Sequence, residues 1–217
     1  MKKKTSISFL TLLLAVIITV FISCSEDSPT TQEEQEETTG TFTDSRDNQT
    51  YDWIKIGDQV WMAENLSYKP SSGNFWAINN IENNVPILGY LYSWEIAQSI
   101  SPNGWHLPSQ AEWQILVNQL GGTDQAYDKL LESVTNHWRN PNSATNESGF
   151  TALPTGYFDQ RDNSFNGTEF LTMFHSSTEY SGNSESAMGL LLNQNFHEAN
   201  IEGRPKLLAL PVRCIKD

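Results

Sequence analysis

The stretch TYDWIKIGDQVWMAENL, residues 50–66, predicts a β-hairpin at the start of the fold. Gly57 and Asp58 form a two-residue turn with glycine in the first position, which suits a type II′ turn. This register pairs Ile54 with Trp61 and Trp53 with Met62. One face then carries Ile54, Ile56 and Trp61, and the other carries Trp53, Val60 and Met62. Because both faces are apolar, we expect the sheet to be covered on two sides, the alternative being one face offered to a partner.

Two amphipathic helices follow in the middle of the chain. Ser109 is an N-cap residue and Glu112 stands three residues later, which is the pattern of a capping box. Apolar residues then recur at helical spacing, at Trp113, Leu116, Val117 and Leu120, and Gly121 ends the helix. A second helix is predicted from about Asp124, with a stripe of Tyr127, Leu130, Leu131 and Val134. Such stripes are typical of core faces.

The rest of the chain is less regular. We predict a long loop over Tyr68–Pro86, a poorly periodic helix over Leu88–Gln98 and an irregular region from His137 to about Ser186. Short strands are predicted near Met188–Asn193 and Leu207–Ile215. Because Pro211 lacks a backbone N–H donor, we expect the last strand to be an edge strand or to contain a bulge. Strands first, helices in the middle and strands last predict an α+β domain.

The N-terminus is typical of a secreted lipoprotein. Lys2–Lys4 precede an apolar run over Ile7–Ile22, which is the pattern of a signal peptide. The run ends at Phe21-Ile22-Ser23-Cys24, which resembles a bacterial lipobox although Phe21 replaces the usual Leu. We therefore predict a signal peptide over 1–23 and a lipid anchor on Cys24, the alternative being an uncleaved membrane helix. Ser25-Glu26-Asp27 resembles the export signal of Bacteroidetes-type surface lipoproteins.

Residues 24–40 are predicted to be a disordered acidic tether, with the domain over 41–217. Residues 25–40 hold six acidic side chains and no aliphatic or aromatic one. Such a stretch cannot bury enough apolar surface to order itself.

The charge of the chain excludes some partners. The 217 residues include 13 Lys and Arg against 26 Asp and Glu, for a formal net charge of −13. Three of the basic residues lie in the leader, so the mature chain is more acidic still. Binding to nucleic acid needs a basic surface, and docking to anionic lipid by charge is equally disfavoured. Contact with the membrane is expected through the lipid anchor alone.

Several blocks together resemble the Fibrobacter succinogenes major paralogous domain, abbreviated FISUMP, from about Thr41 to Asp217. They are TFTD at 41–44, KIGDQVWMAENL at 55–66, GWHLPS at 104–109, AEW at 111–113, TNESGF at 145–150, SSTE at 176–179 and VRC at 212–214. The segment 104–113 is also similar to the helix-entry motif of formylglycine-generating enzymes. The resemblance implies a C-type-lectin-like fold with paired terminal strands, two or three helices and a long irregular loop region that carries function.

Two positions depart from the family pattern. The resemblance places a cysteine at position 101 as the partner of Cys214, but this chain has Ser101. We therefore expect Ser101 and Cys214 to be neighbours without a disulfide. His175 replaces an aromatic residue that is often Trp in the family.

From the sequence we expect that the protein is not an enzyme. Formylglycine-generating enzymes use a pair of cysteines, and this domain has one. No HExxH, GxSxG or phosphate-binding loop motif occurs. His106, His137, His175 and His197 lack metal-ligand spacing, so we expect no metal and no cofactor, with calcium bound by loop acids as the alternative.

We expect a non-catalytic binding module for a glycan, the alternative being an assembly or adhesion protein that binds another envelope protein. Phe75 and Trp76 are the candidate ligand-binding residues, because they lie in an Asn-rich loop outside every family block, the alternative for Trp76 being a ring that tucks down as a loop anchor. Aromatic rings stack on sugar C–H faces, and Asn side chains bond hydroxyl groups. The expected location is the outer membrane, facing the cell surface, with a periplasm-facing orientation as the alternative.

Overall fold

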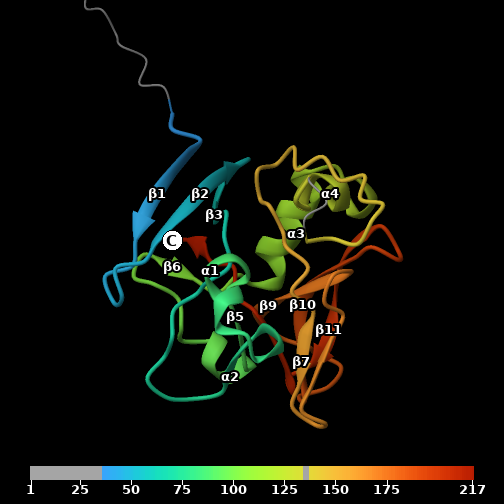
Figure 1. The fold of residues 1–217 in the computed structure, drawn as a ribbon. Helices are drawn as coiled ribbons and strands as arrows, with labels where there is room; N and C mark the ends of the chain where they lie inside the picture. Colours follow the sequence, from blue (N-terminus) through green and yellow to red (C-terminus); the bar gives the residue numbers. More distant parts are fainter. Residues whose placement is uncertain (1–35, 134–136) are drawn as a thin grey trace, which may run out of the picture. The chain divides into compact units, whose positions relative to one another are not determined.

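The structure is a computed structural model that describes residues 36–133 and 137–217 (Figure 1). The signal peptide, the anchor Cys24, residues 25–35 of the tether and the helix position Val134 lie outside the described residues. The compact unit begins at Glu36, and its first strand begins at Thr39. Thr39 and Gly40, which were predicted to belong to the tether, are part of β1 and pair with the hairpin. None of the described helices is long and apolar enough to cross a membrane.

The first sheet contains the predicted hairpin. Its order is β1-β2-β3-β13-β6, and the strands are antiparallel neighbours. They span β1 Thr39–Thr43, β2 Thr50–Ile56, β3 Gln59–Met62, β6 Trp105–His106 and β13 Ile215–Lys216. The predicted register is confirmed, since Ile54 lies opposite Trp61 and Trp53 opposite Met62. The first and last strands share this sheet but are not paired directly, because the hairpin lies between them.

The second sheet carries the two main helices on one face (Figure 1). Its order is β11 (Glu198–Pro205), β10 (Ser186–Asn193) and β9 (Leu171–Glu179). The helices are α3, Gln110–Gln119, and α4, Thr123–Leu130. The capping box between Ser109 and Glu112 is confirmed. Because side chains alternate along a strand, Phe174 packs near Trp113 while Met173 joins a separate cluster on the other face.

Four strands of the third sheet lie where no strand was predicted: β4 in the long loop, β5 in the helix over 88–98, and β7 and β8 in the irregular region. Its order is β4-β5-β12-β7-β8, with bounds β4 Phe75–Ala77, β5 Tyr90–Tyr92, β7 Tyr157–Asp159, β8 Ser164–Asn166 and β12 Leu208–Pro211. Short helices complete this part: η1 Ile78–Asn80, η2 Glu82–Asn84, α1 Val85–Leu88 and α2 Trp94–Ala97. The predictions of one long loop over 68–86, a single helix over 88–98 and an irregular region from 137 to about 186 were therefore wrong in part. Strand β12 is central in its sheet rather than an edge, and Pro211 is its last residue.

The hairpin separates two hydrophobic clusters. Ile54, Ile56 and Trp61 pack with Trp113 and Phe150 on one side. Met62 packs with Tyr51, Tyr92 and Cys214 on the other side, where Trp53 and Val60 lie at the margin. Burial of both faces, rather than exposure of one, is confirmed. The fold is a mixed α+β arrangement of three sheets, mostly strands, with a few short helices.

Candidate functional site

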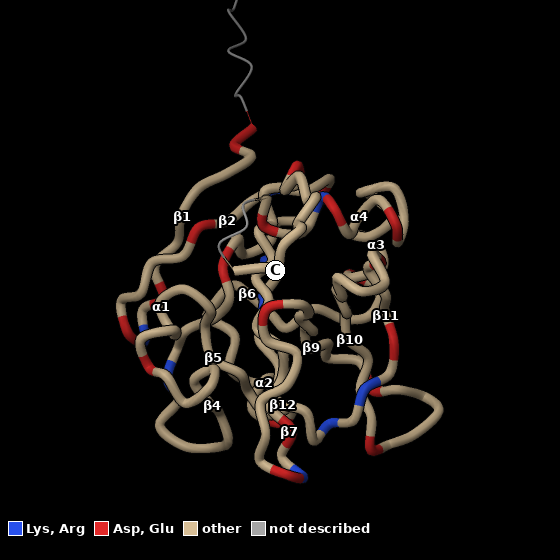
Figure 2. The backbone as a smooth tube through the Cα atoms, turned by 45° about the vertical axis from the view of Figure 1, so that its right-hand side comes forward, with Lys and Arg blue, Asp and Glu red and all other residues tan. Residues whose placement is uncertain are grey.

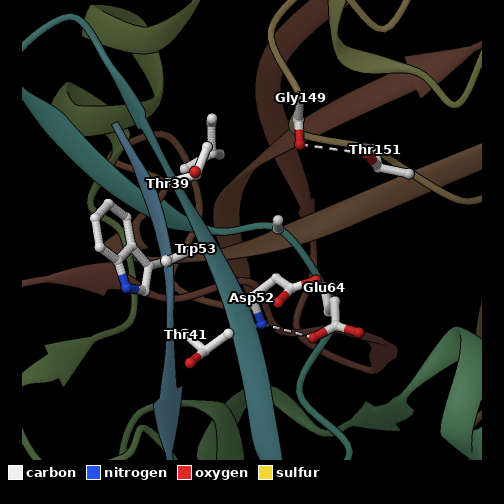
Figure 3. Close-up of a pocket in the computed structure, with 10 residues that line it drawn as sticks. Thr39, Thr41, Asp52, Trp53, Glu64, Gly149 and Thr151 are labelled. Carbon is white, nitrogen blue, oxygen red and sulfur yellow. Dashed lines mark hydrogen bonds between the residues drawn. The ribbon is translucent and has the colours of Figure 1, made fainter. Parts of the chain in front are cut away.

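A groove of about 570 Å³ opens beside β1 and β2 (Figure 3). We call it the β1–β2 groove. Its lining residues come from four segments, namely the strands β1 and β2, the turn after β3 and the loop before Ala152. They are Thr39, Gly40, Thr41, Asp52, Trp53, Ile54, Ala63, Glu64, Gly149 and Thr151. None of them was a candidate for ligand binding on the sequence alone.

One face of the β1–β2 pair forms the floor of the groove. Thr39 lies opposite Ile54 and Thr41 lies opposite Asp52, so these four side chains share a face. Trp53 belongs to the opposite face, and Figure 3 shows its ring pointing away from Gly149 and Thr151. That ring packs on Gly40, where an added Cβ would lie 2.6 Å from a ring carbon. The groove floor is therefore made of hydroxyl, carboxylate and aliphatic groups rather than an aromatic ring.

Backbone hydrogen bonds fix the two walls, residues 63–64 and 149–151. The amide of Ala63 donates to the carbonyl of Asp52 at 2.8 Å, and the amide of Asp52 donates to Glu64 Oε2 at 2.8 Å. On the other wall, the amide of Thr151 donates to Asn146 Oδ1 at 2.9 Å. One wall is thus tied to the backbone of Asp52 and the other to the side chain of Asn146, and one oxygen of Glu64 is used in the process.

The groove offers hydrogen-bonding groups to solvent. Thr39, Thr41, Asp52 and Glu64 are exposed, whereas Ile54 is half-buried. Threonine hydroxyls both donate and accept, and carboxylates accept. This combination suits a ligand that has many hydroxyl groups and a small apolar surface. The alternation of Thr39, Thr41, Asp52 and Ile54 can be seen in the sequence, but the wall at 149–151 cannot, since it comes from a distant loop.

The structure gives Phe75 and Trp76 a packing role. Both are half-buried in β4 rather than exposed on a loop. The ring of Trp76 stacks on Phe158 with centroids 4.4 Å apart, and Phe75 meets Tyr90 edge to face at 5.3 Å. Neither residue lines the β1–β2 groove. Ligand binding by these two residues stays a prediction, and the structure supplies the loop-anchor alternative for Trp76.

The histidines are dispersed in space as well as in sequence. His175 is buried, its Nε2 lies 2.8 Å from the carbonyl oxygen of Tyr92, and burial lowers the pKa of His175 to about 4. His137 contacts Glu132 at 3.0 Å, and His197 packs beside Tyr127. Within residues 36–133 and 137–217, no three His, Cys, Asp or Glu side chains gather as a metal site would need.

His106 joins the start of α3 to the C-terminus. Its Nε2 lies 2.8 Å from Glu112 Oε1, and its Nδ1 lies 2.7 Å from Asp217 Oδ1. Partial burial disfavours the charged form, but the hydrogen bonds to Glu112 and Asp217 outweigh it and raise the pKa of His106. These contacts give His106 a structural role in holding β6, α3 and the chain end together.

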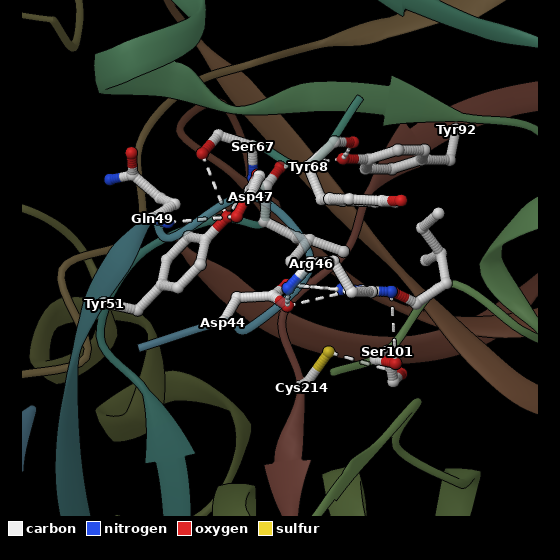
Figure 4. Close-up of polar contacts among 12 residues, drawn as sticks. Asp44, Arg46, Asp47, Gln49, Tyr51, Ser67, Tyr68, Tyr92, Ser101 and Cys214 are labelled. Carbon is white, nitrogen blue, oxygen red and sulfur yellow. Dashed lines mark hydrogen bonds and ion pairs between the residues drawn. The ribbon is translucent and has the colours of Figure 1, made fainter. Parts of the chain in front are cut away.

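Ser101 and Cys214 are neighbours, as expected. The Sγ of Cys214 donates to Ser101 Oγ at 3.4 Å, and burial raises the pKa of the thiol to about 12 (Figure 4). Beside them, Arg46 Nη1 donates to the carbonyl of Ile100 at 2.7 Å and Arg46 Nε to Asp44 Oδ1 at 2.9 Å. Burial opposes ionisation of Asp44, but the hydrogen bonds from Arg46 lower its pKa. The buried thiol is protonated and sits in a structural polar network.

Comparison with known proteins assigns the family. A comparison with curated proteins and one with solved structures gave no match. The family model described as the Fibrobacter succinogenes major domain matches residues 54–216, which is more than half of the chain and holds most of the motif blocks. The chain therefore belongs to the Fibrobacter succinogenes major domain family, FISUMP.

Proposed function

We propose that this protein is an envelope lipoprotein whose FISUMP domain binds a glycan in the β1–β2 groove without catalysing a reaction. The observation that carries the proposal is the groove itself. Exposed hydroxyl and carboxylate groups line its floor and one wall, beside the aliphatic surface of Ile54. Sugar hydroxyls donate to carboxylates and exchange hydrogen bonds with threonine hydroxyls.

The charges of the domain support a ligand without acidic groups. Figure 2 shows basic residues dispersed singly along the backbone among more numerous acidic ones. Several basic side chains pair with carboxylates, as in Arg46 with Asp44, Arg161 with Asp159 and Lys206 with Glu179. The charged residues that line the groove are Asp52 and Glu64, which repel anions. A neutral or amino-bearing saccharide is the class that fits.

A glycan array with the purified full chain tests the proposal. We expect saturable binding that Asp52→Ala and Thr41→Ala each weaken by about 1–2 kcal/mol. Asp58→Ala is the matched control, because Asp58 is an exposed carboxylate in the hairpin turn outside the groove. Trp76→Ala tests the alternative site in the same assay. If binding survives in both groove variants and is lost in Trp76→Ala, the ligand binds at β4 and not in the groove.

The second candidate function is binding to another envelope protein. Strand β1 is at the end of its sheet order and pairs with β2 alone among the described strands. An edge strand of this kind can accept a strand from a partner. A photo-crosslinking residue at Thr43 in living cells tests this alternative. Repeated capture of one envelope protein, with an array that shows no glycan binding, would favour it.

We also propose that Cys24 carries the lipid anchor. Its place after the apolar run and before two acids supports this. In the native host, Cys24→Ala should abolish labelling by a clickable fatty acid and release the chain from the membrane fraction. Equal labelling of the variant would place the anchor elsewhere. Protease treatment of intact cells then separates the cell-surface orientation that we propose from a periplasm-facing one.

The C-type-lectin-like arrangement is proposed on the same family resemblance. It is supported by the first and last described strands sharing one sheet, and by two main helices packed on another. An experimental structure that superposes on lectin-like domains over the three sheets would establish it.

A further inference from the structure

Arg213 is a buried arginine whose hydrogen-bond partners are all uncharged. The residue is 1% exposed, and no carboxylate within residues 36–133 and 137–217 forms an ion pair with it. Its Nε and Nη2 donate to Asn65 Oδ1 at 3.0 and 2.7 Å. The rings of Phe150 and Phe174 flank the guanidinium carbon at 4.4 and 5.5 Å. Burial lowers the pKa of Arg213 to about 9, so the side chain is still charged at neutral pH.

A buried charge that forms no ion pair is costly, and the nearby charge of Glu64 offsets the effect of burial only in part. The hydrogen-bond partners of Arg213 therefore show what the residue does. Besides Asn65, Arg213 donates to main-chain carbonyls. Its Nη1 reaches Met62 O at 3.4 Å and also Phe150 O, and its Nη2 reaches Thr151 O at 3.4 Å. Met62 is the last residue of β3, and Phe150 and Thr151 lie in the loop before Ala152, so these carbonyls stand where regular strand pairing ends. The planar fork of arginine, with five donors, can.

Those acceptors coincide with the two walls of the β1–β2 groove. Met62 and Asn65 immediately flank the wall residues Ala63 and Glu64. Phe150 and Thr151 belong to the opposite wall, 149–151. Asn65 is itself held, since its Nδ2 donates to the carbonyl of Leu88 at 2.9 Å. One side chain from the C-terminal segment therefore joins two walls that are far apart in the sequence.

We propose that Arg213 is a positioning residue that holds the two walls of the groove at a fixed separation. The proposal rests on the proposed function only for its effect on ligand affinity. Its geometric part stands on the hydrogen bonds of Arg213 alone. The fork, rather than the charge, carries the effect, because an ammonium group at the same place cannot bridge the same acceptors.

Hydrogen exchange on the full chain tests the geometric part. The wall amides of Ala63, Gly149 and Thr151 are hydrogen-bonded, so loosening of either wall is measurable. In Arg213→Lys, which keeps the charge, and Arg213→Met, which removes it, we expect peptides over 60–66 and 146–152 to exchange about tenfold faster. Peptides over α3 and β11 should not change. Arg161→Lys is the matched control, because Arg161 is exposed and pairs with Asp159 away from the groove.

Affinity for the glycan with the strongest array signal tests the consequence. We expect Arg213→Lys to bind it about tenfold more weakly, as loss of hydrogen bonds to a charged group implies. Looser walls with unchanged affinity would overturn the positioning role. So would faster exchange in one wall alone, faster exchange throughout the molecule, or failure of both variants to fold. An array without any binder would end the proposed function, while the exchange pattern would still decide whether Arg213 holds the walls.

Discussion

Trp76 shows how one side chain can serve as an anchor for a short strand. The sequence left two roles open for Trp76: an exposed ring, whose replacement would leave folding nearly unchanged, or a ring that anchors its loop. In the structure its ring stacks on Phe158 and packs beside Leu91 and Ile78. Stacked aromatic pairs contribute stability beyond the area that they bury.

We now expect Trp76→Ala to lower the free energy of unfolding by about 1–3 kcal/mol, because it removes this stack and leaves a gap beside a buried cluster. Urea unfolding followed by circular dichroism gives the value. Phe196→Ala is the matched control, since Phe196 is 66% exposed and its loss should cost less than about 0.5 kcal/mol. Equal losses in the two variants would contradict the packing role of Trp76.

At the level of elements, the N-terminus of α3 combines a capping box with a histidine bridge. Ser109 and Glu112 cap the helix reciprocally, and Glu112 also bonds to His106. The raised pKa of His106 means that the folded state binds the proton more tightly than the unfolded chain. The resulting stability is fully present below the pKa of the unfolded chain and is lost as the pH rises through the pKa of the folded state.

His106→Gln should therefore cost more stability at about pH 6 than at about pH 9, because the stabilisation is lost as the pH rises through the pKa of the folded state. The difference should stay below about 1 kcal/mol, because His106 is partly exposed and solvent screens its ion pairs. Urea unfolding of the wild type and the variant at both pH values measures it. Asp217→Asn, which weakens one of the two partners, should reduce the same pH dependence. A cost that is equal at both pH values would mean that the raised pKa plays no part in stability.

The elements that the sequence predicted well are those coded by local patterns. The turn at Gly57 sets the hairpin register, and Ser109 with Glu112 marks the start of α3. Strands β4, β5, β7 and β8 have three residues each, which is too short for a periodic pattern, and β5 and β7 pair with β12 from far along the chain. The groove was missed for the same reason, since Gly149 and Thr151 reach Asp52 only through the tertiary fold.

At the scale of the molecule, long-range contacts join the middle of the chain to its end. Ser101 precedes β6 and Cys214 precedes β13, and these strands are neighbours in the first sheet. The two residues are 113 positions apart in the sequence. A covalent link here would close a long loop and reduce the entropy of the unfolded chain.

Ser101→Cys, in a chain that also carries Cys24→Ala, should form a disulfide with Cys214 on oxidation. In the chain-entropy model the bridge adds about 4–5 kcal/mol to the free energy of unfolding, and engineered bridges often give less. A shift in electrophoretic mobility and a rise in melting temperature, both reversed by reductant, would confirm it. Ser101→Ala is the control without a second thiol. If both thiols stay free after prolonged oxidation of the folded protein, residues 101 and 214 are not close enough to bridge.

The two-sided hairpin also bears on how the chain avoids misfolding. When only one face of a sheet is apolar, a slip of one residue exposes the core face and is heavily penalised. Here both faces of the β2–β3 hairpin are apolar, so burial of the hairpin does not by itself fix where β1 pairs with β2. Gly40 reduces that ambiguity, because the ring of Trp53 leaves no room for a Cβ at residue 40. A slip of one residue would put Thr39 or Thr41 opposite Trp53, and the Cβ of either would meet the ring. Discrimination between the native pairing and its nearest competitor thus rests on a residue of β1 that has no side chain, together with Phe42, whose ring stacks on Tyr51 and Trp105 in the native pairing.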